Sequence, residues 1–122
     1  MIDLKRLARS FKHAFAGVHY ALNHDQNLLI HFFAAFFVVL LSVVFKITPF
    51  EMSILGVTIL LVISAEMINS ALEKMVDLIT KEHRVEARYA KDVAAGMVLM
   101  TTVGSVIVGF LIFLPYILRL FR

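Results

Sequence analysis

The first part of the chain has apolar side chains that recur every three or four positions between residues 4 and 22. This spacing puts them on one face of a helix and leaves four basic side chains on another face. The apolar residues are Leu4, Leu7, Ala8, Phe11, Ala14, Phe15, Val18 and Leu22, and the basic ones are Lys5, Arg6, Arg9 and Lys12. We therefore predict an amphipathic helix over residues 3–23 that lies in the membrane interface. A soluble helix that packs on a partner protein is the alternative.

Three long apolar runs follow this segment, and polar residues are rare in them. The first run has 18 residues, of which only His31 and Ser42 are polar, and this length is just sufficient for a transmembrane helix. The second run continues with helical spacing past Ser64 into a charged stretch. We predict membrane spans over residues 28–45, 52–80 and 93–118.

The segments between these spans are short and differ in charge. In the turn at residues 46–51, Pro49 interrupts the helix between the first and second spans. The charged segment 81–92 connects the second span to the third. Three glycines in the third span allow neighbouring backbones to come close: Gly96, Gly104 and Gly109.

Composition supports a membrane protein with a single domain over residues 1–122. The chain is 61% hydrophobic with a mean hydropathy of +0.88, which is too apolar for a soluble domain of this length. Lys and Arg are concentrated in residues 1–27, which hold four, and in residues 74–92, which hold five. The amino terminus and the segment before the third span are therefore expected on the cytoplasmic side. The absence of cysteine excludes disulfides and thiolate chemistry.

Four polar side chains lie where the second span should leave the membrane. At about 100° per residue, they fall on one helix face within an arc of roughly 80°: Glu66, Asn69, Glu73 and Asp77. Ionisable groups at this depth normally face a bundle interior or a watery cavity. A helix that simply becomes a solvated extension after Ser64 would explain the same pattern without a functional site.

Carboxylates combined with an amide, and without cysteine, favour a hard cation such as Mg²⁺. The pair Lys91-Asp92 returns to the same membrane face, so that acidic metal ligands and a cation for phosphate charge would meet there. This combination is typical of phosphoryl transfer. The chain contains no P-loop motif, and any nucleotide would be bound in another way. A small ion or proton translocator also uses intramembrane acids and is the non-enzyme alternative.

Two motifs together resemble the prokaryotic diacylglycerol kinase family, which includes the undecaprenol kinases. They read Glu66-x-x-Asn69-x-Ala71-x-Glu73-x-x-x-Asp77 and Ala90-Lys91-Asp92-x-Ala94-Ala95-Gly96. The stretch 27–31, NLLIH, is similar to the N-x-R-I-H of the undecaprenol kinase branch. The resemblance implies a homotrimeric, all-α enzyme of the bacterial cell membrane with a cytoplasmic active site. It would transfer the γ-phosphoryl group of Mg-ATP to a lipid alcohol, with undecaprenol favoured and diacylglycerol as the alternative.

The resemblance also implies roles for individual residues. Glu66 matches the general base, Asp25 and Glu73 match metal ligands, and Asn69 and Asp77 match supporting positions. The ATP-binding positions are Arg6, His13, Asp25, Glu73, Glu82, Arg84, Lys91 and Asp92, and the lipid-binding ones are Arg6, Glu66 and Ala95. Because one chain has few elements with which to enclose both substrates and shield Glu66, we expect a neighbouring subunit to complete the site.

Four positions depart from the family's pattern. Asp25 is one methylene shorter than the usual Glu, and it also suits the role of a helix cap. Leu29 replaces an Arg of the undecaprenol kinase branch, and Arg84 replaces the usual His of the loop. Met97 is larger than the residue that the family prefers.

Overall fold

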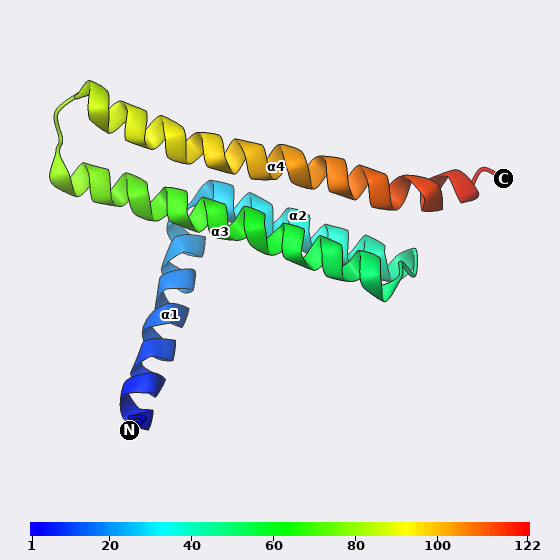
Figure 1. Cartoon of the computed structure of the whole chain (residues 1–122), viewed down its shortest axis with the longest axis horizontal. Coiled ribbons are helices and arrows are strands. Elements are labelled where there is room, and N and C mark those ends of the chain that lie inside the picture. The colour runs from blue at the N-terminus through cyan, green and yellow to red at the C-terminus, as the bar shows by residue number, and fades with distance from the viewer.

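The computed structural model describes all residues 1–122 and contains only helices. The elements are α1 (Leu4–His24), α2 (Gln26–Val44), α3 (Pro49–Ile79) and α4 (Val85–Arg119) (Figure 1). Three of them, α2, α3 and α4, are long and apolar enough to cross a membrane. The predicted all-α membrane fold with three spans is confirmed to this extent.

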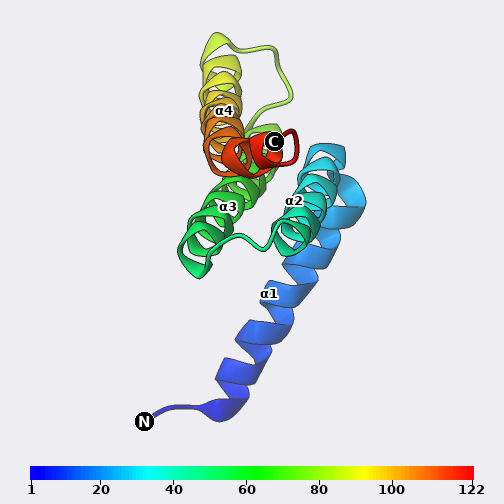
Figure 2. The same ribbon diagram turned by 90° about the vertical axis from the view of Figure 1, so that its right-hand side faces the viewer.

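The three apolar helices run side by side, and α1 projects away from them at a steep angle (Figures 1 and 2). The most extensive packing is between α3 and α4, and α2 lies against α3 with a smaller contact. The first helix meets the bundle only at its carboxyl end, next to the start of α2. The position of α1 on the membrane surface stays a prediction.

A single residue, Asp25, separates α1 from α2 and caps both helices. Its backbone N–H donates to the carbonyl of Ala21 at the end of α1. Its Oδ1 accepts from the backbone N–H groups of Asn27 (2.9 Å) and Leu28 (3.2 Å) at the start of α2. Because a side-chain oxygen satisfies these otherwise unpaired amides, Asp25 fixes the point at which the chain turns.

The turn between α2 and α3 ends in a capping box. Thr48 Oγ1 accepts from the Glu51 N–H (3.2 Å), and the Glu51 carboxylate accepts from the Thr48 N–H (2.9 Å). Pro49 occupies the first turn of α3, where its fixed φ favours the helix and no N–H is needed. The interpretation of Pro49 as a helix breaker was therefore incomplete, because this residue also begins the next helix.

The fourth helix begins at Val85, eight positions before the predicted span. Most of the charged segment 81–92 is therefore helical, and between α3 and α4 only Thr80–Arg84 lie outside the helices. At 1.5 Å per residue, α3 and α4 are about 47 and 53 Å long, whereas the hydrocarbon core of a bilayer is about 30 Å thick. The two helices therefore extend well beyond the membrane.

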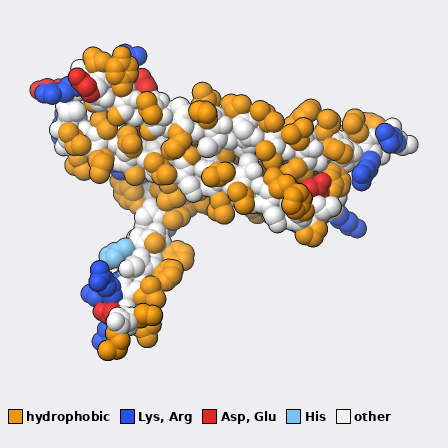
Figure 3. Space-filling model, in the orientation of Figure 1, with side chains coloured by type: hydrophobic (Ala, Val, Ile, Leu, Met, Phe, Trp, Pro, Cys, Tyr) orange, Lys and Arg blue, Asp and Glu red, His pale blue; other side chains and the backbone are white.

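Apolar side chains cover most of the surface of the bundle, while charged groups gather at its two ends and on α1 (Figure 3). Only 11 of the 122 residues are buried within the chain, so lipid or other chains must cover the rest of the apolar surface. A Cβ added at any of the three glycines of α4 would meet no atom within 4 Å. The close backbone approach expected at these glycines is therefore not made within one chain.

A small core closes the end of the bundle opposite the Thr80–Arg84 loop. Its buried members are Ile47, Leu55, Ile112 and Phe113. Beside it, the Tyr116 hydroxyl donates to Glu51 Oε2 at 2.6 Å and thereby joins the end of α4 to the start of α3. The Arg119 guanidinium lies 5.3 Å from the centre of the Tyr116 ring. This end of the bundle is thus held by both apolar and polar contacts.

Candidate active site

A groove of about 460 Å³ lies where the α1–α2 junction crosses α3. Three carboxylates line it, those of Asp25, Glu73 and Asp77. The last turns of α1 contribute Tyr20 and His24 to its wall. The groove therefore brings the carboxylate of Asp25 at the junction together with those of Glu73 and Asp77 on α3, although Asp25 is far from the other two in the sequence.

The side chain of Asp25 has a further contact that joins the junction to α3. While its Oδ1 caps α2, its Oδ2 accepts a hydrogen bond from the Ser70 hydroxyl. Ser70 lies on α3 between Glu66 and Glu73, and it also lines the groove. This contact was not predicted, although Ser70 lies four positions after Glu66 and three before Glu73, and so on nearly the same helix face.

Glu66 is almost completely buried, with 2% of its surface exposed. The start of α2 covers it, and Asp25, Asn27 and His31 are the polar groups from that side which lie near enough to act on its charge. Leu28, near the start of α2, has no exposed surface either. Within one chain, α2 therefore already shields Glu66, and completion of the site by a neighbouring subunit stays a prediction.

The predicted acidic face of α3 is buried at one end and exposed at the other. Glu66 and Asn69 are buried, whereas Glu73 and Asp77 are exposed, because α3 extends past the start of α2. The Asn69 side-chain N–H donates to Glu73 Oε1 at 3.5 Å, and its Oδ1 is buried without a partner. Asn69 thus connects the buried and the open parts of this face.

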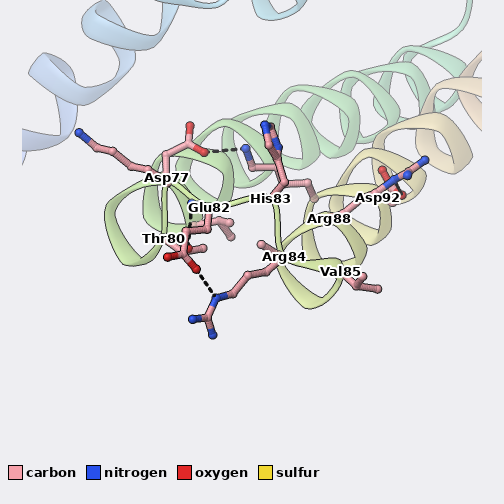
Figure 4. Close-up of a pocket in the computed structure, with 12 residues that line it drawn as sticks. Asp77, Thr80, Glu82, His83, Arg84, Val85, Arg88 and Asp92 are labelled. Atoms are coloured by element: carbon pink, nitrogen blue, oxygen red, sulfur yellow. Dashed lines mark hydrogen bonds and ion pairs between the residues drawn. The ribbon is translucent and has the colours of Figure 1, made fainter.

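A second hollow, of about 840 Å³, lies between the end of α3, the Thr80–Arg84 loop and the start of α4 (Figure 4). Its charged lining consists of Asp77, Lys81, Glu82, Arg84, Arg88, Lys91 and Asp92. Several of these groups are paired. Lys91 Nζ lies 2.6 Å from Asp77 Oδ1, Arg84 Nε lies 3.2 Å from Glu82 Oε2, and the Arg88–Asp92 separation is 3.7 Å.

Asp77 lines both the groove and the hollow by the loop, and it lies at the boundary between these two spaces. Lys91 lies in the charged first turns of α4, before the apolar stretch 93–118, and its hydrogen bond with Asp77 raises the pKa of the ammonium group. Lys91 is therefore a permanent cation at this boundary. The hollow by the loop is lined by three carboxylates and four Lys or Arg residues, whereas the groove is lined by three carboxylates and one Lys.

The structure brings together most of the predicted site residues, but not all of them. The groove contains Asp25, Glu73 and Asp77, and the hollow contains Glu82, Arg84, Lys91 and Asp92. Arg6 and His13 are exposed on the projecting part of α1 and line neither space. Ala95 does not line either space.

The donor set in the groove fits a hard divalent cation. Asp25 and Glu73 supply carboxylate oxygens to the same space, and no group of three or more His, Cys, Asp or Glu side chains is arranged to hold a metal. Mg²⁺ needs only one or two carboxylates, because water and phosphate oxygens complete its octahedron. Two acids beside an open groove suit a cation that arrives with a nucleotide.

Comparison with known proteins gave a match to one family and two relatives. The prokaryotic diacylglycerol kinase family matches residues 12–113. A diacylglycerol kinase from Synechocystis sp. is 38% identical over 112 residues, which are 91% of this chain and 64% of that protein. An undecaprenol kinase from Bacillus subtilis is 38% identical over 113 residues, 93% of this chain and 92% of that protein. The chain thus spans less than two thirds of the first relative and nearly all of the second.

Proposed function

Since this chain belongs to the prokaryotic diacylglycerol kinase family, we propose that it uses ATP to phosphorylate a membrane lipid alcohol, with undecaprenol as the acceptor. The observation that carries this proposal is the buried carboxylate of Glu66 next to a groove with two candidate metal ligands. Undecaprenol is favoured because the relative that this chain spans almost completely is named an undecaprenol kinase. Diacylglycerol is the second candidate, because the other relative is named a diacylglycerol kinase.

The chemistry follows from the position of Glu66. The hydroxyl of the lipid gives its proton to the Glu66 carboxylate, and its oxygen forms a bond to the γ-phosphorus of ATP. The bond between the γ-phosphorus and the β,γ-bridging oxygen breaks, and ADP leaves with that oxygen. Because α2 covers Glu66, water has little access to this carboxylate, which favours transfer to the lipid over hydrolysis of ATP.

The groove and the hollow by the loop bind different parts of the nucleotide. We place the base and ribose beside the Thr80–Arg84 loop, so that the phosphates run past Lys91 toward Glu73 and Asp25. Asp25 and Glu73 would hold Mg²⁺, which when bound neutralises charge on the phosphate oxygens. Lys91 supports the phosphates as a point charge, and Asp77 keeps the ammonium in position.

We propose that the enzyme is a homotrimer with sites shared between subunits and that α1 lies on the cytoplasmic membrane surface. Arg6 and His13 support sharing, because they lie on the part of α1 that projects away from the bundle and do not line the groove of their own chain. The open glycine face of α4 also leaves room for a neighbour. Ala95 lies in that helix and would contact the lipid substrate there.

Sharing can be tested with two inactive variants. Glu66→Gln removes the proton acceptor of its own chain's site, and Arg6→Ala removes the cation that α1 would contribute to a neighbour's site. If sites are shared, co-assembled trimers of the two variants recover part of the activity, because a site with the native Glu66 can then take the native Arg6 from another chain. Strictly zero activity in verified mixed trimers would favour self-contained sites.

The function is tested by incorporation of phosphate from ATP into chloroform-soluble lipid, measured separately with undecaprenol and with diacylglycerol. We expect Mg²⁺-dependent product with undecaprenol and little with diacylglycerol, and a rate about 10²- to 10⁴-fold lower for Glu66→Gln. A reversed preference would assign diacylglycerol as the acceptor. If neither lipid is phosphorylated and proteoliposomes show ion or proton flux, the translocator alternative replaces the kinase.

A further inference from the structure

Lys74 lines the same groove as the three carboxylates and is an unpaired cation there. It makes no salt bridge and donates no hydrogen bond within the chain, although Glu73 is its neighbour in sequence and Asp77 lies one helical turn away. Its Nζ instead lies 5.1 Å from the centre of the Tyr20 ring. At this distance the face of the ring attracts the ammonium without using its N–H donors.

The ring that holds Lys74 is itself fixed in place. The Tyr20 and His24 rings stack with their centres 4.0 Å apart and their planes at 15°. His24 Nδ1 donates to the backbone carbonyl of Tyr20 at 2.8 Å, since a carbonyl can only accept. The last turn of α1 thus presents a supported aromatic surface to α3, and Lys74 is the side chain of α3 that lies over it.

The charges around the groove show why a free cation is needed there. Three carboxylates line the space that we assign to the phosphates, and a nucleotide polyphosphate adds further negative charge. Lys91 reaches the boundary of this space but is already paired with Asp77 at 2.6 Å. Lys74 is the only Lys or Arg among the residues that line the groove itself.

We infer that Lys74, held over the Tyr20 ring, binds the polyphosphate of the nucleotide in the groove as a second cation beside Lys91. This inference rests on the proposed kinase function and adds a binding residue to it. An ammonium with all its donors free can give three charge-assisted hydrogen bonds to phosphate oxygens, whereas Lys91 already gives one of its three N–H groups to Asp77. The aromatic ring keeps Lys74 close to the acids and still available.

The experiment measures KM for ATP and for the lipid in maltoside micelles, which contain no phosphate. We expect Lys74→Gln to raise KM for ATP about tenfold, equivalent to about 1.4 kcal/mol, with KM for the lipid unchanged. Lys74→Arg and Tyr20→Phe should stay within about twofold of the wild type, because charge and ring are kept, whereas Tyr20→Leu should raise KM for ATP. Lys12→Gln, on the exposed part of α1, is the matched loss of one cation and should have no effect.

A lipid headgroup is the other source of phosphate that Lys74 could contact at a membrane surface. The measurements are therefore repeated in bilayer discs with one third phosphatidylglycerol. An effect of Lys74→Gln that appears only in the anionic discs would overturn the inference and assign the residue to lipid binding. An equal effect in micelles and discs supports the nucleotide.

A binding measurement separates this inference from the proposed function. Calorimetric titration with Mg²⁺ and a non-hydrolysable ATP analogue should show weaker binding to Lys74→Gln than to the wild type, without any lipid acceptor. If the wild type phosphorylates lipid but Lys74→Gln has the same KM for ATP and the same affinity for the analogue, the inference alone fails. If the wild type phosphorylates neither lipid, the proposed function fails.

Discussion

Asp25 has two roles that substitution can separate, as a helix cap and as a charged group in the groove. Asp25→Asn keeps an oxygen for the amides of Asn27 and Leu28, and Asn caps helices about as well as Asp. It removes the negative charge that a metal ion needs. Asp25→Ala removes the cap, the charge and the acceptor of the Ser70 hydroxyl together.

The expected losses differ between stability and activity. Removing the cap costs about 1 kcal/mol, and the lost Ser70 contact costs about 1 kcal/mol more, so Asp25→Ala should lower the free energy of unfolding by about 2 kcal/mol. Asp25→Asn should lower it by less than about 0.5 kcal/mol. Both variants should lose most of their turnover at physiological Mg²⁺. Asp25→Glu should keep or improve turnover, because the longer side chain restores the carboxylate that the family uses, while weakening the cap.

The assay combines lipid phosphorylation over a range of Mg²⁺ concentrations with thermal inactivation in micelles. Asp25→Asn is the decisive variant, because it keeps the cap while it loses the charge, and its amide N–H can donate to the Ser70 oxygen in place of the acceptor that is lost. An Asp25→Asn enzyme with the turnover and Mg²⁺ dependence of the wild type would refute the metal assignment. Asp25 would then be only a cap, and Glu73 would hold the ion with water and phosphate oxygens.

Three further predictions concern other parts of the chain. Glu66→Gln should lower kcat by about 10²- to 10⁴-fold with little change in KM for ATP, since it removes only the proton acceptor, and an unchanged kcat in the lipid assay would exclude that role. Lys91→Met should raise KM for ATP at least tenfold. It should change stability by less than about 1 kcal/mol, because the ion pair of Lys91 with Asp77 is exposed, and thermal inactivation of variant and wild type measures this change. Tyr116→Phe should lower stability by about 1 kcal/mol through loss of the hydrogen bond to Glu51 without changing kcat/KM, and a loss of activity at unchanged stability would contradict this.

The long apolar runs determined most of what could be predicted about the fold. Runs of 18 or more predominantly apolar residues have few alternatives to membrane helices, so the number and order of the spans followed directly from the sequence. The helix ends were harder to predict. Residues 85–92 are charged but also good helix formers, so the start of α4 lies two turns before the membrane boundary that hydropathy predicts.

The contacts of the candidate site depend on how α2 crosses α3, which no local pattern gives. Helical spacing predicted that Glu66, Asn69 and Glu73 share a face. It did not predict that α2 covers Glu66 and Asn69 but leaves Glu73 exposed. The contact of Ser70 with Asp25 joins residues 45 positions apart, and the contact of Lys74 with Tyr20 crosses from α3 to α1. Such long-range pairs arise from tertiary packing.

The one-residue junction at Asp25 has a mechanical consequence for the proposed enzyme. If α1 lies on the membrane surface, as proposed, and α2, about 29 Å long, spans the hydrocarbon, a change in bilayer thickness is absorbed by the tilt of α2 or by the depth of α1. Both helices end at Asp25, and the Ser70 contact ties that residue to α3. A bilayer that is too thick or too thin would therefore pull this carboxylate away from Glu73, so that the rate of catalysis becomes a measure of membrane thickness.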